Sequence, residues 1–231
     1  MSEHGVHTDD SRAHHHDAHD LDAPDCEAHD FDARAATWDD DPAKVERARV
    51  VADAIRDAVP LTPTMRLLDY GAGTGLLSER LVDDVGALVL ADPSAGMRAV
   101  AEAKVASGAL PDAQVLDLDL ARDAAPAGER FDLVVTMLTL HHVPDVRTVL
   151  ARFAQLLEPH GWLAVADLVA EDGSFHGTGF EGHHGFDTGE LSEWLRAVGF
   201  GPVTVTICHQ VRKNDRDYPL FLATCRREPA G

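Results

Sequence analysis

Carboxylates and alternate glycines stand at the ends of the first apolar runs of the chain. Asp69 ends a short apolar run, and a helical pattern begins soon after it. Between the two lie Gly71, Gly73 and Gly75. Glycines suit a strand–turn–helix junction because they tolerate positive φ and let a ligand approach the backbone. Asp92 ends the next apolar run, where a carboxylate can accept both hydroxyls of a ribose. The pattern therefore predicts a site for a nucleoside-like ligand.

The spacing of the three glycines narrows the choice of ligand. It is G-x-G-x-G, whereas the dinucleotide fingerprint is G-x-G-x-x-G. The third glycine of that fingerprint would fall at position 76, where Leu76 stands. A nicotinamide-dependent oxidoreductase is therefore the weaker alternative among enzymes.

Alternating strand and helix patterns indicate how these groups are positioned. From residue 66 to residue 168 the alternation is typical of βαβ units around a parallel sheet. A helix is expected over 43–59 before the first strand, and another over 188–198 after a loop rich in glycine and histidine, 170–186. The last two runs predict a closing antiparallel hairpin; they cover 203–208 and 218–225.

Four motifs follow one another along the chain. They are Leu-Asp-Tyr-Gly-Ala-Gly-Thr-Gly at 68–75, Ala-Asp-Pro-Ser-Ala-Gly-Met at 91–97, Phe-Asp-Leu-Val at 131–134 and Leu-Leu-Glu-Pro-His-Gly at 156–161. In this order they resemble the class I S-adenosylmethionine-dependent methyltransferases, particularly the small ones without insertions, over residues 31–226. The resemblance implies a doubly wound, Rossmann-like α/β fold with a seven-stranded mixed sheet and a terminal antiparallel hairpin. It also implies S-adenosylmethionine (SAM) at the carboxyl ends of the strands, and methyl transfer. His160 departs from the family, which usually has glycine there.

The resemblance assigns roles to individual residues. The predicted cofactor-binding residues are Asp69, Gly71, Gly73, Gly75, Asp92, Met97, Asp119 and Thr136. Asp69 is expected to pair with the ammonium group of SAM, directly or through water, and Asp92 with the ribose hydroxyls. Asp119 is expected to accept from the adenine amino group, with Asp117 as the alternative. Met97 would lie on the adenine face, and Thr136 would line the methionine side. The simpler alternatives are a helix N-cap for Asp92 and plain core packing for Met97.

The acceptor side is expected to involve histidines, because imidazole titrates nearest to neutral pH. We predict a pocket built from residues 31–42 and the loop 170–186, with His142 and His184 facing it as catalytic residues. Further candidates for a base are His141, Asp167, His176 and His183. For each of them, packing or ordinary hydrogen bonding is an equal alternative, and His142 also fits a family pattern in which it borders the cofactor without acting as base. The lid over the cofactor would contain Phe31, Arg34 and Trp38, with simple helix packing as the equal alternative for Trp38.

Residues 1–30 differ in composition from the methyltransferase domain predicted over 31–231. They contain seven histidines and nine acidic residues, with almost no large apolar side chain. Such a segment cannot bury enough surface to offset its ordering entropy, so we expect a disordered tail. Its histidines and carboxylates predict weak binding of transition metals, and the alternative is a solvated low-complexity leader. No metal site is predicted in the folded domain.

Charge and composition limit the partners. A formal net charge of −20 opposes binding to nucleic-acid phosphates, so a small-molecule methyl acceptor is expected and a nucleic acid is not. No run of eighteen apolar residues occurs and the N-terminus lacks the features of a secretory signal, so we expect a cytoplasmic protein without a membrane partner. Outside enzymes, the alternative is a SAM-binding or metal-handling protein without turnover, for which the histidine-rich tail would be used.

Overall fold

The predicted seven-stranded mixed sheet is present in the computed structural model, which describes residue 1 and residues 31–229. Its strands are β1 Arg66–Tyr70, β2 Ala87–Ala91, β3 Gln114–Leu116, β4 Phe131–Met137, β5 Leu157–Leu168, β6 Thr204–Lys213 and β7 Arg216–Arg226. Their order is β3-β2-β1-β4-β5-β7-β6. The first five strands are parallel, and β7 is antiparallel to both β5 and β6. The predicted disordered tail falls on residues outside the described range.

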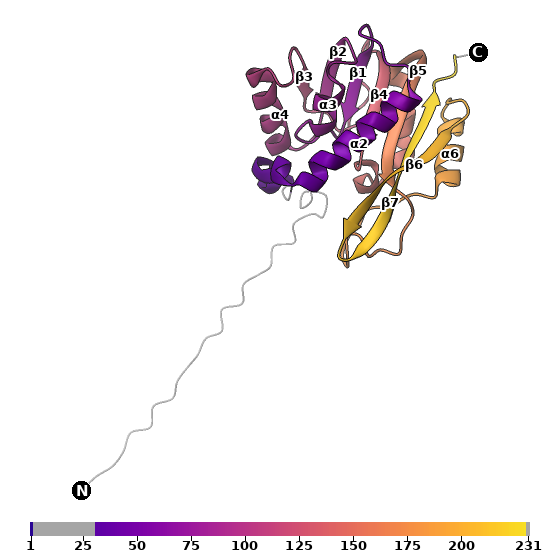
Figure 1. Ribbon diagram of the computed structural model, residues 1–231. Coiled ribbons are helices and arrows are strands. Elements are labelled where there is room, and N and C mark those ends of the chain that lie inside the picture. The colour runs from indigo at the N-terminus through magenta and orange to yellow at the C-terminus, as the bar shows by residue number, and fades with distance from the viewer. Residues whose placement is uncertain (2–30, 230–231) are drawn as a thin grey trace.

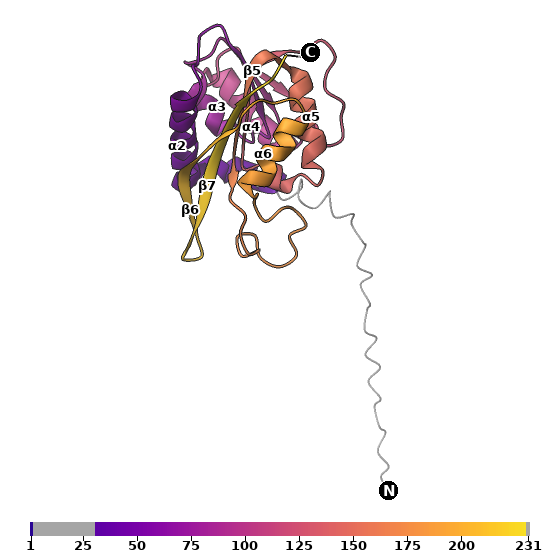
Figure 2. The same cartoon turned by 90° about the vertical axis from the view of Figure 1, so that its right-hand side faces the viewer.

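Helices cover both faces of the sheet, as Figures 1 and 2 show. They are η1 Ala35–Asp40, α2 Pro42–Ala58, α3 Leu76–Leu81, α4 Ala95–Ser107, η2 Leu140–His142, α5 Val146–Leu156 and α6 Thr188–Ala197, where η marks a 3₁₀ helix. Apolar side chains of α2 and α3 share one hydrophobic cluster with one face of the sheet. Those of α5 and α6 form a second cluster on the opposite face. The domain is therefore a three-layer α/β sandwich.

The sequence of helix α2 accounts for where the helix begins and which of its faces is buried. Asp41 caps it, because its Oδ1 accepts a hydrogen bond from the backbone N–H of Ala43 at 2.9 Å, and Pro42 occupies the first turn. One stripe of the helix is buried against the sheet and α3; it consists of Ala48, Val51, Ala52 and Ile55. The observed ends differ by one residue from the predicted range 43–59.

The closing hairpin is longer than the predicted strands. Asn214 and Asp215 form a two-residue connection, and their φ angles of 50° and 59° are those of a tight hairpin turn. Next to it, Arg212 lies opposite Asp217 across the two strands with an N–O distance of 3.0 Å. Among the polar residues between the two predicted strands, 212–213 and 216–217 are therefore paired strand residues, and only Asn214 and Asp215 form the turn of the hairpin.

The order of the strands changes direction between β1 and β4. The chain extends the sheet from β1 through β2 to β3, and then in the opposite direction from β4 to β5. Ligands of open α/β sheets bind beyond the carboxyl ends of the strands at such a reversal. The loop 170–186 and the tip of the β6–β7 hairpin project beyond this end of the sheet (Figure 1). Among the described helices, none is long and apolar enough to span a membrane.

Candidate active site

The turn after β1 is tied to the end of β2 by Asp92. One oxygen of this carboxylate accepts from the backbone N–H of Gly73 at 2.7 Å, and the other accepts from that of Ser94 at 2.9 Å. The Asp92 side chain is almost buried, and this burial raises the pKa of its carboxyl group. Each oxygen keeps a further lone pair, so Asp92 can still accept from a ligand. The carboxylate acts as a helix N-cap only in part, because Ser94 is the N-cap of α4.

The three glycines of the turn have positive φ angles, but their surroundings differ. A Cβ built on Gly71 would lie 2.2 Å from Cγ2 of Thr139, so the loop after β4 already fills that space. A Cβ built on Gly73 would meet its nearest described neighbour, Sδ of Met97, at 3.8 Å. Gly73 is therefore the position where a ligand can approach the backbone closely, beside Asp92. The predicted residues Gly73, Asp92 and Met97 thus meet at one point, and they fit a nucleoside group there.

Asp69 is a buried carboxylate at the end of β1. Its side chain is buried, and its Oδ2 accepts a hydrogen bond from the Ser78 hydroxyl at 2.7 Å. Burial raises the pKa of the Asp69 carboxyl to about 7, and the bond from Ser78 opposes this rise. The carboxylate therefore joins the end of β1 to helix α3.

Strand β3 ends at Leu116, so both acidic candidates for the adenine contact lie beyond it. The Asp117 side chain is 71% exposed and pairs with Arg98 at 2.9 Å. The Asp119 side chain is 21% exposed, and its Oδ1 accepts from the backbone N–H of Ala121 at 2.8 Å. Asp119 is therefore the more enclosed of the two. The Thr136 hydroxyl, at the end of β4, is buried and makes no hydrogen bond to the described residues.

The segment 31–40 lies over the same edge of the sheet. Oδ1 of Asp32 accepts from the Ser94 hydroxyl at 2.5 Å and from the backbone N–H of Gly96 at 2.8 Å. Farther along, Asp39 accepts from the Thr74 hydroxyl at 2.5 Å and pairs with Lys104 at 2.6 Å. These contacts fasten the segment to the glycine turn and to α4.

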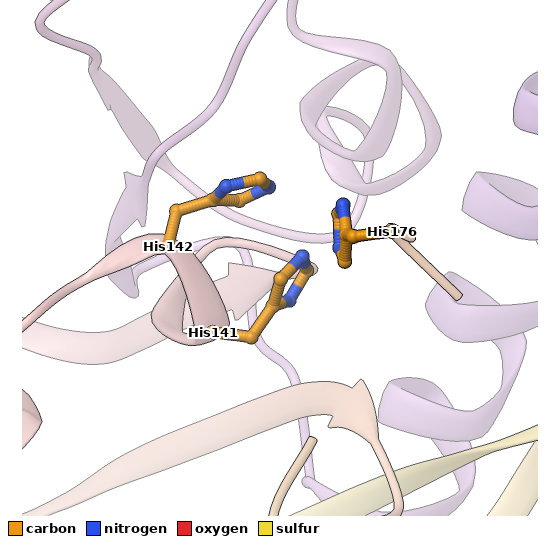
Figure 3. A group of neighbouring side chains, drawn as sticks. All are labelled: His141, His142 and His176. Carbon is orange, nitrogen blue, oxygen red and sulfur yellow. The ribbon is translucent and has the colours of Figure 1, made fainter. Parts of the chain in front are cut away.

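Three histidines gather at the carboxyl end of β4. His141 and His142 belong to η2, and His176 comes from the loop 170–186. The ring centroid of His141 lies 4.2 Å from that of His142 and 5.0 Å from that of His176. Figure 3 shows the three rings turned toward a common space. A hydrogen bond fixes the His141 ring, because its Nδ1 lies 2.6 Å from Oδ1 of the buried Asp167.

Aromatic rings enclose this group of histidines. The His142 ring contacts both Phe31 and Phe180 edge to face, with centroid distances of 5.3 and 5.4 Å. The His176 ring stacks on Phe180 at 3.8 Å. Burial is the main reason why the pKa of His142 falls to about 2 and that of His176 to about 4. Both imidazoles are therefore uncharged at neutral pH.

His184 lies apart from this group. Its side chain is 43% exposed, and its Nδ1 is 3.5 Å from Oε1 of Glu171. It lines a hollow of about 400 Å³ on the loop, together with Gly173 and Phe180. The structure thus brings His142 together with His141 and His176 and leaves His184 outside this group. The convergence of the three histidines was not predicted, since their proximity depends on the path of a loop without regular structure.

Comparison with known proteins identifies the family. Residues 43–205 match the family model described as a methyltransferase domain. The chain belongs to this family. The match confirms the predicted membership of the class I SAM-dependent methyltransferases, whose cofactor is SAM.

Individual relatives agree with this assignment. A ubiquinone biosynthesis O-methyltransferase of Azorhizobium caulinodans is 34% identical over 154 residues, which are 60% of this chain and 60% of that protein. An uncharacterized methyltransferase of Schizosaccharomyces pombe is 35% identical over 119 residues, 49% of this chain and 42% of that protein. The chain thus spans between 42% and 60% of the length of these relatives.

Solved structures show the fold. The structure of a DhpI–SAH complex is 23% identical, has a TM-score of 0.68, and matches 90% of this chain and 98% of that one. The N-methyltransferase NodS from Bradyrhizobium japonicum, in complex with S-adenosylhomocysteine (SAH), is 19% identical with a TM-score of 0.67 over 87% and 97% of the two chains. The methyltransferase sheet is therefore shared although the sequences have diverged.

Proposed function

We propose that this methyltransferase-domain protein transfers a methyl group from SAM to a hydroxyl group of a small-molecule acceptor. The observation that carries the proposal is the position of Asp92, whose carboxylate is held beside the open backbone of Gly73 where the sheet order reverses. The name of the Azorhizobium caulinodans relative, an O-methyltransferase, favours oxygen as the accepting atom.

The residues of this chain divide into those that would hold the cofactor and those that shape its surroundings. Asp92 would accept from the ribose hydroxyls, and Asp119 from the adenine amino group. Met97, buried beside Gly73, would pack on the adenine. The negative charge of Asp69 would attract the ammonium group of SAM across the glycine turn. The buried Thr136 hydroxyl would be a hydrogen-bond partner for the methionine part of SAM. When bound, SAM supplies a methyl group on an electrophilic sulfonium.

The acceptor would lie against the histidines at the end of β4. Phe31 and Phe180 exclude water from the space around His142, and alignment in a dry site accelerates a direct displacement. His142 would orient the acceptor as an uncharged imidazole, and His141 could take the proton of a hydroxyl at Nε2, since its Nδ1 is engaged by Asp167. His184 keeps its predicted role at the rim of the acceptor pocket. The cytoplasmic location also remains a prediction.

The experiment is a screen of methyl transfer from labelled SAM to panels of phenols, thiols, amines and carboxylates. A phenol or another hydroxyl compound is expected to be the best acceptor. With that acceptor, His142→Ala should lower kcat more than it lowers the affinity for SAM, and His184→Ala should do so to a smaller extent. Full turnover in both variants would refute the pocket, and labelling confined to amines or thiols would refute the acceptor class.

A further inference from the structure

We propose that His141, His142 and His176 form a binding site for one divalent transition-metal ion, with Zn²⁺ as the expected ion. The site is separate from the histidines of the N-terminal tail. It requires no methyl transfer, so it can be tested independently of the proposed function.

The first argument is convergence. One ring nitrogen from each of the three histidines lies within 4.8 Å of those from the other two. In tetrahedral zinc sites the Zn–N distance is about 2.0–2.1 Å, which places ligand nitrogens about 3.3 Å apart. The rings must therefore approach one another by up to about 1.5 Å. His176 can make this movement, because Gly173, Gly177 and Gly179 flank it in a loop without regular structure.

The second argument is the support behind His141. Oδ1 of Asp167 lies 2.6 Å from Nδ1 of His141, so this nitrogen carries the proton and Nε2 offers its lone pair. Asp167 is itself buried and fixed, since it also accepts from the backbone N–H groups of His141 and Leu168. A carboxylate that orients a histidine in this way is the usual outer partner of a zinc ligand.

The third argument is an unsatisfied ring nitrogen. Nε2 of His176 is buried and makes no hydrogen bond to any described residue. A buried polar atom without a partner costs about 1–3 kcal/mol. A metal ion in the common space would be the partner of this nitrogen.

Three protein ligands leave one position of a tetrahedral ion open. Three histidines with an open fourth position are characteristic of catalytic rather than purely structural zinc. A metal-bound water molecule would be the fourth ligand. If the acceptor is a hydroxyl compound, as proposed above, its oxygen could replace that water. Nε2 of His141 would then be a metal ligand, and the role as base proposed for it above applies only to the metal-free protein.

The test is a titration of the full-length chain with Co²⁺, which reports tetrahedral nitrogen coordination through its visible absorption. Each histidine of residues 1–30 is replaced by asparagine in every sample, so that the tail contributes no background. The parent protein is expected to bind one Co²⁺ tightly, and Zn²⁺ should displace it. His141→Ala and His176→Ala should each weaken the affinity at least about 10–100-fold, and Asp167→Asn should weaken it by a similar factor through His141.

His184→Ala is the matched control, because it removes a histidine from the same loop outside the cluster. It should keep the absorption band and the affinity. Circular dichroism establishes that each variant is folded, and His176, on a loop, can be replaced without loss of the core. The proposal is overturned if the folded parent shows no tight tetrahedral band, or if His176→Ala binds Co²⁺ as well as His184→Ala does. SAH binding measured on the same samples separates this result from a failure of the proposed function.

Discussion

The backbone N–H of Gly73 donates a hydrogen bond of 2.7 Å to the carboxylate of Asp92. This bond joins the turn after β1 to the end of β2, so the two sequence features that indicate a nucleoside site belong to one structural unit. The carboxylate is thereby fixed before any ligand binds, and little conformational entropy is lost when it accepts a hydrogen bond from a ligand.

The first prediction separates backbone strain from ligand contact at Gly73. Gly73 and Gly108 have φ angles of 56° and 84°. A Cβ built on Gly108 would meet nothing within 4 Å, and one built on Gly73 would make only an ordinary contact of 3.8 Å with Sδ of Met97. Alanine at either position should therefore cost about 1–2 kcal/mol of unfolding free energy. Gly73→Ala should in addition weaken SAM binding by roughly tenfold or more, about 1.4 kcal/mol, because the new methyl group occupies the approach to the backbone. Denaturant unfolding and calorimetry measure the two effects, and equal SAM affinities would contradict the predicted contact.

The second prediction concerns the buried Asp69. Its pKa is about 7 in the folded protein and 3.8 when unperturbed, so the folded state binds the extra proton between these values. The contribution of this carboxyl group to the unfolding free energy is therefore greatest below about pH 4. It falls as the pH rises and is lost above about pH 7. Asp69→Asn should remove this fall and raise the unfolding free energy at pH 8 by up to about 4 kcal/mol.

The variant should at the same time bind SAM less tightly, since a neutral amide does not attract the ammonium group. Urea unfolding from pH 4 to pH 8 measures the first effect, and Asp117→Asn, with its side chain 71% exposed, is the control. An unchanged pH profile in Asp69→Asn would show that this carboxyl is ionised throughout.

The third prediction concerns His160, at a position where the family resemblance implies glycine. Its φ of 67° is a left-handed conformation. Among the described residues it forms hydrogen bonds only through its backbone, with the carbonyl of Arg227 and the guanidinium of Arg226. Glycine removes a strain of about 1–2 kcal/mol and adds a backbone entropy cost of roughly 0.5–1 kcal/mol. His160→Gly should therefore raise the unfolding free energy by about 0.5–1 kcal/mol. Glu158→Gly, at an exposed position without positive φ, should lower it; a loss in both variants would refute the strain.

The sequence predicted those features that depend on neighbouring residues. The glycine turn, the acid after β2 and the parallel core all arise from local patterns, because apolar runs and glycines determine strands and turns directly. Local patterns could not show that Ser78 would engage Asp69, or that β3 would end before Asp117. They also could not place His176 beside His141, since that contact depends on a loop whose path is set by tertiary packing.

The fourth prediction, and the most direct measurement, is calorimetry of SAM, SAH and NAD binding to the full chain and to Asp92→Ala. SAM and SAH should bind and NAD should not. Asp92→Ala should weaken SAM by roughly 1–3 kcal/mol, because two ribose hydroxyls lose their acceptor. Asp117→Ala, which removes a neighbouring carboxylate held at the surface by Arg98, should bind SAM as the parent does. Tight binding of NAD without SAM, or equal SAM affinities in Asp92→Ala and the parent, would contradict the assignment of this site.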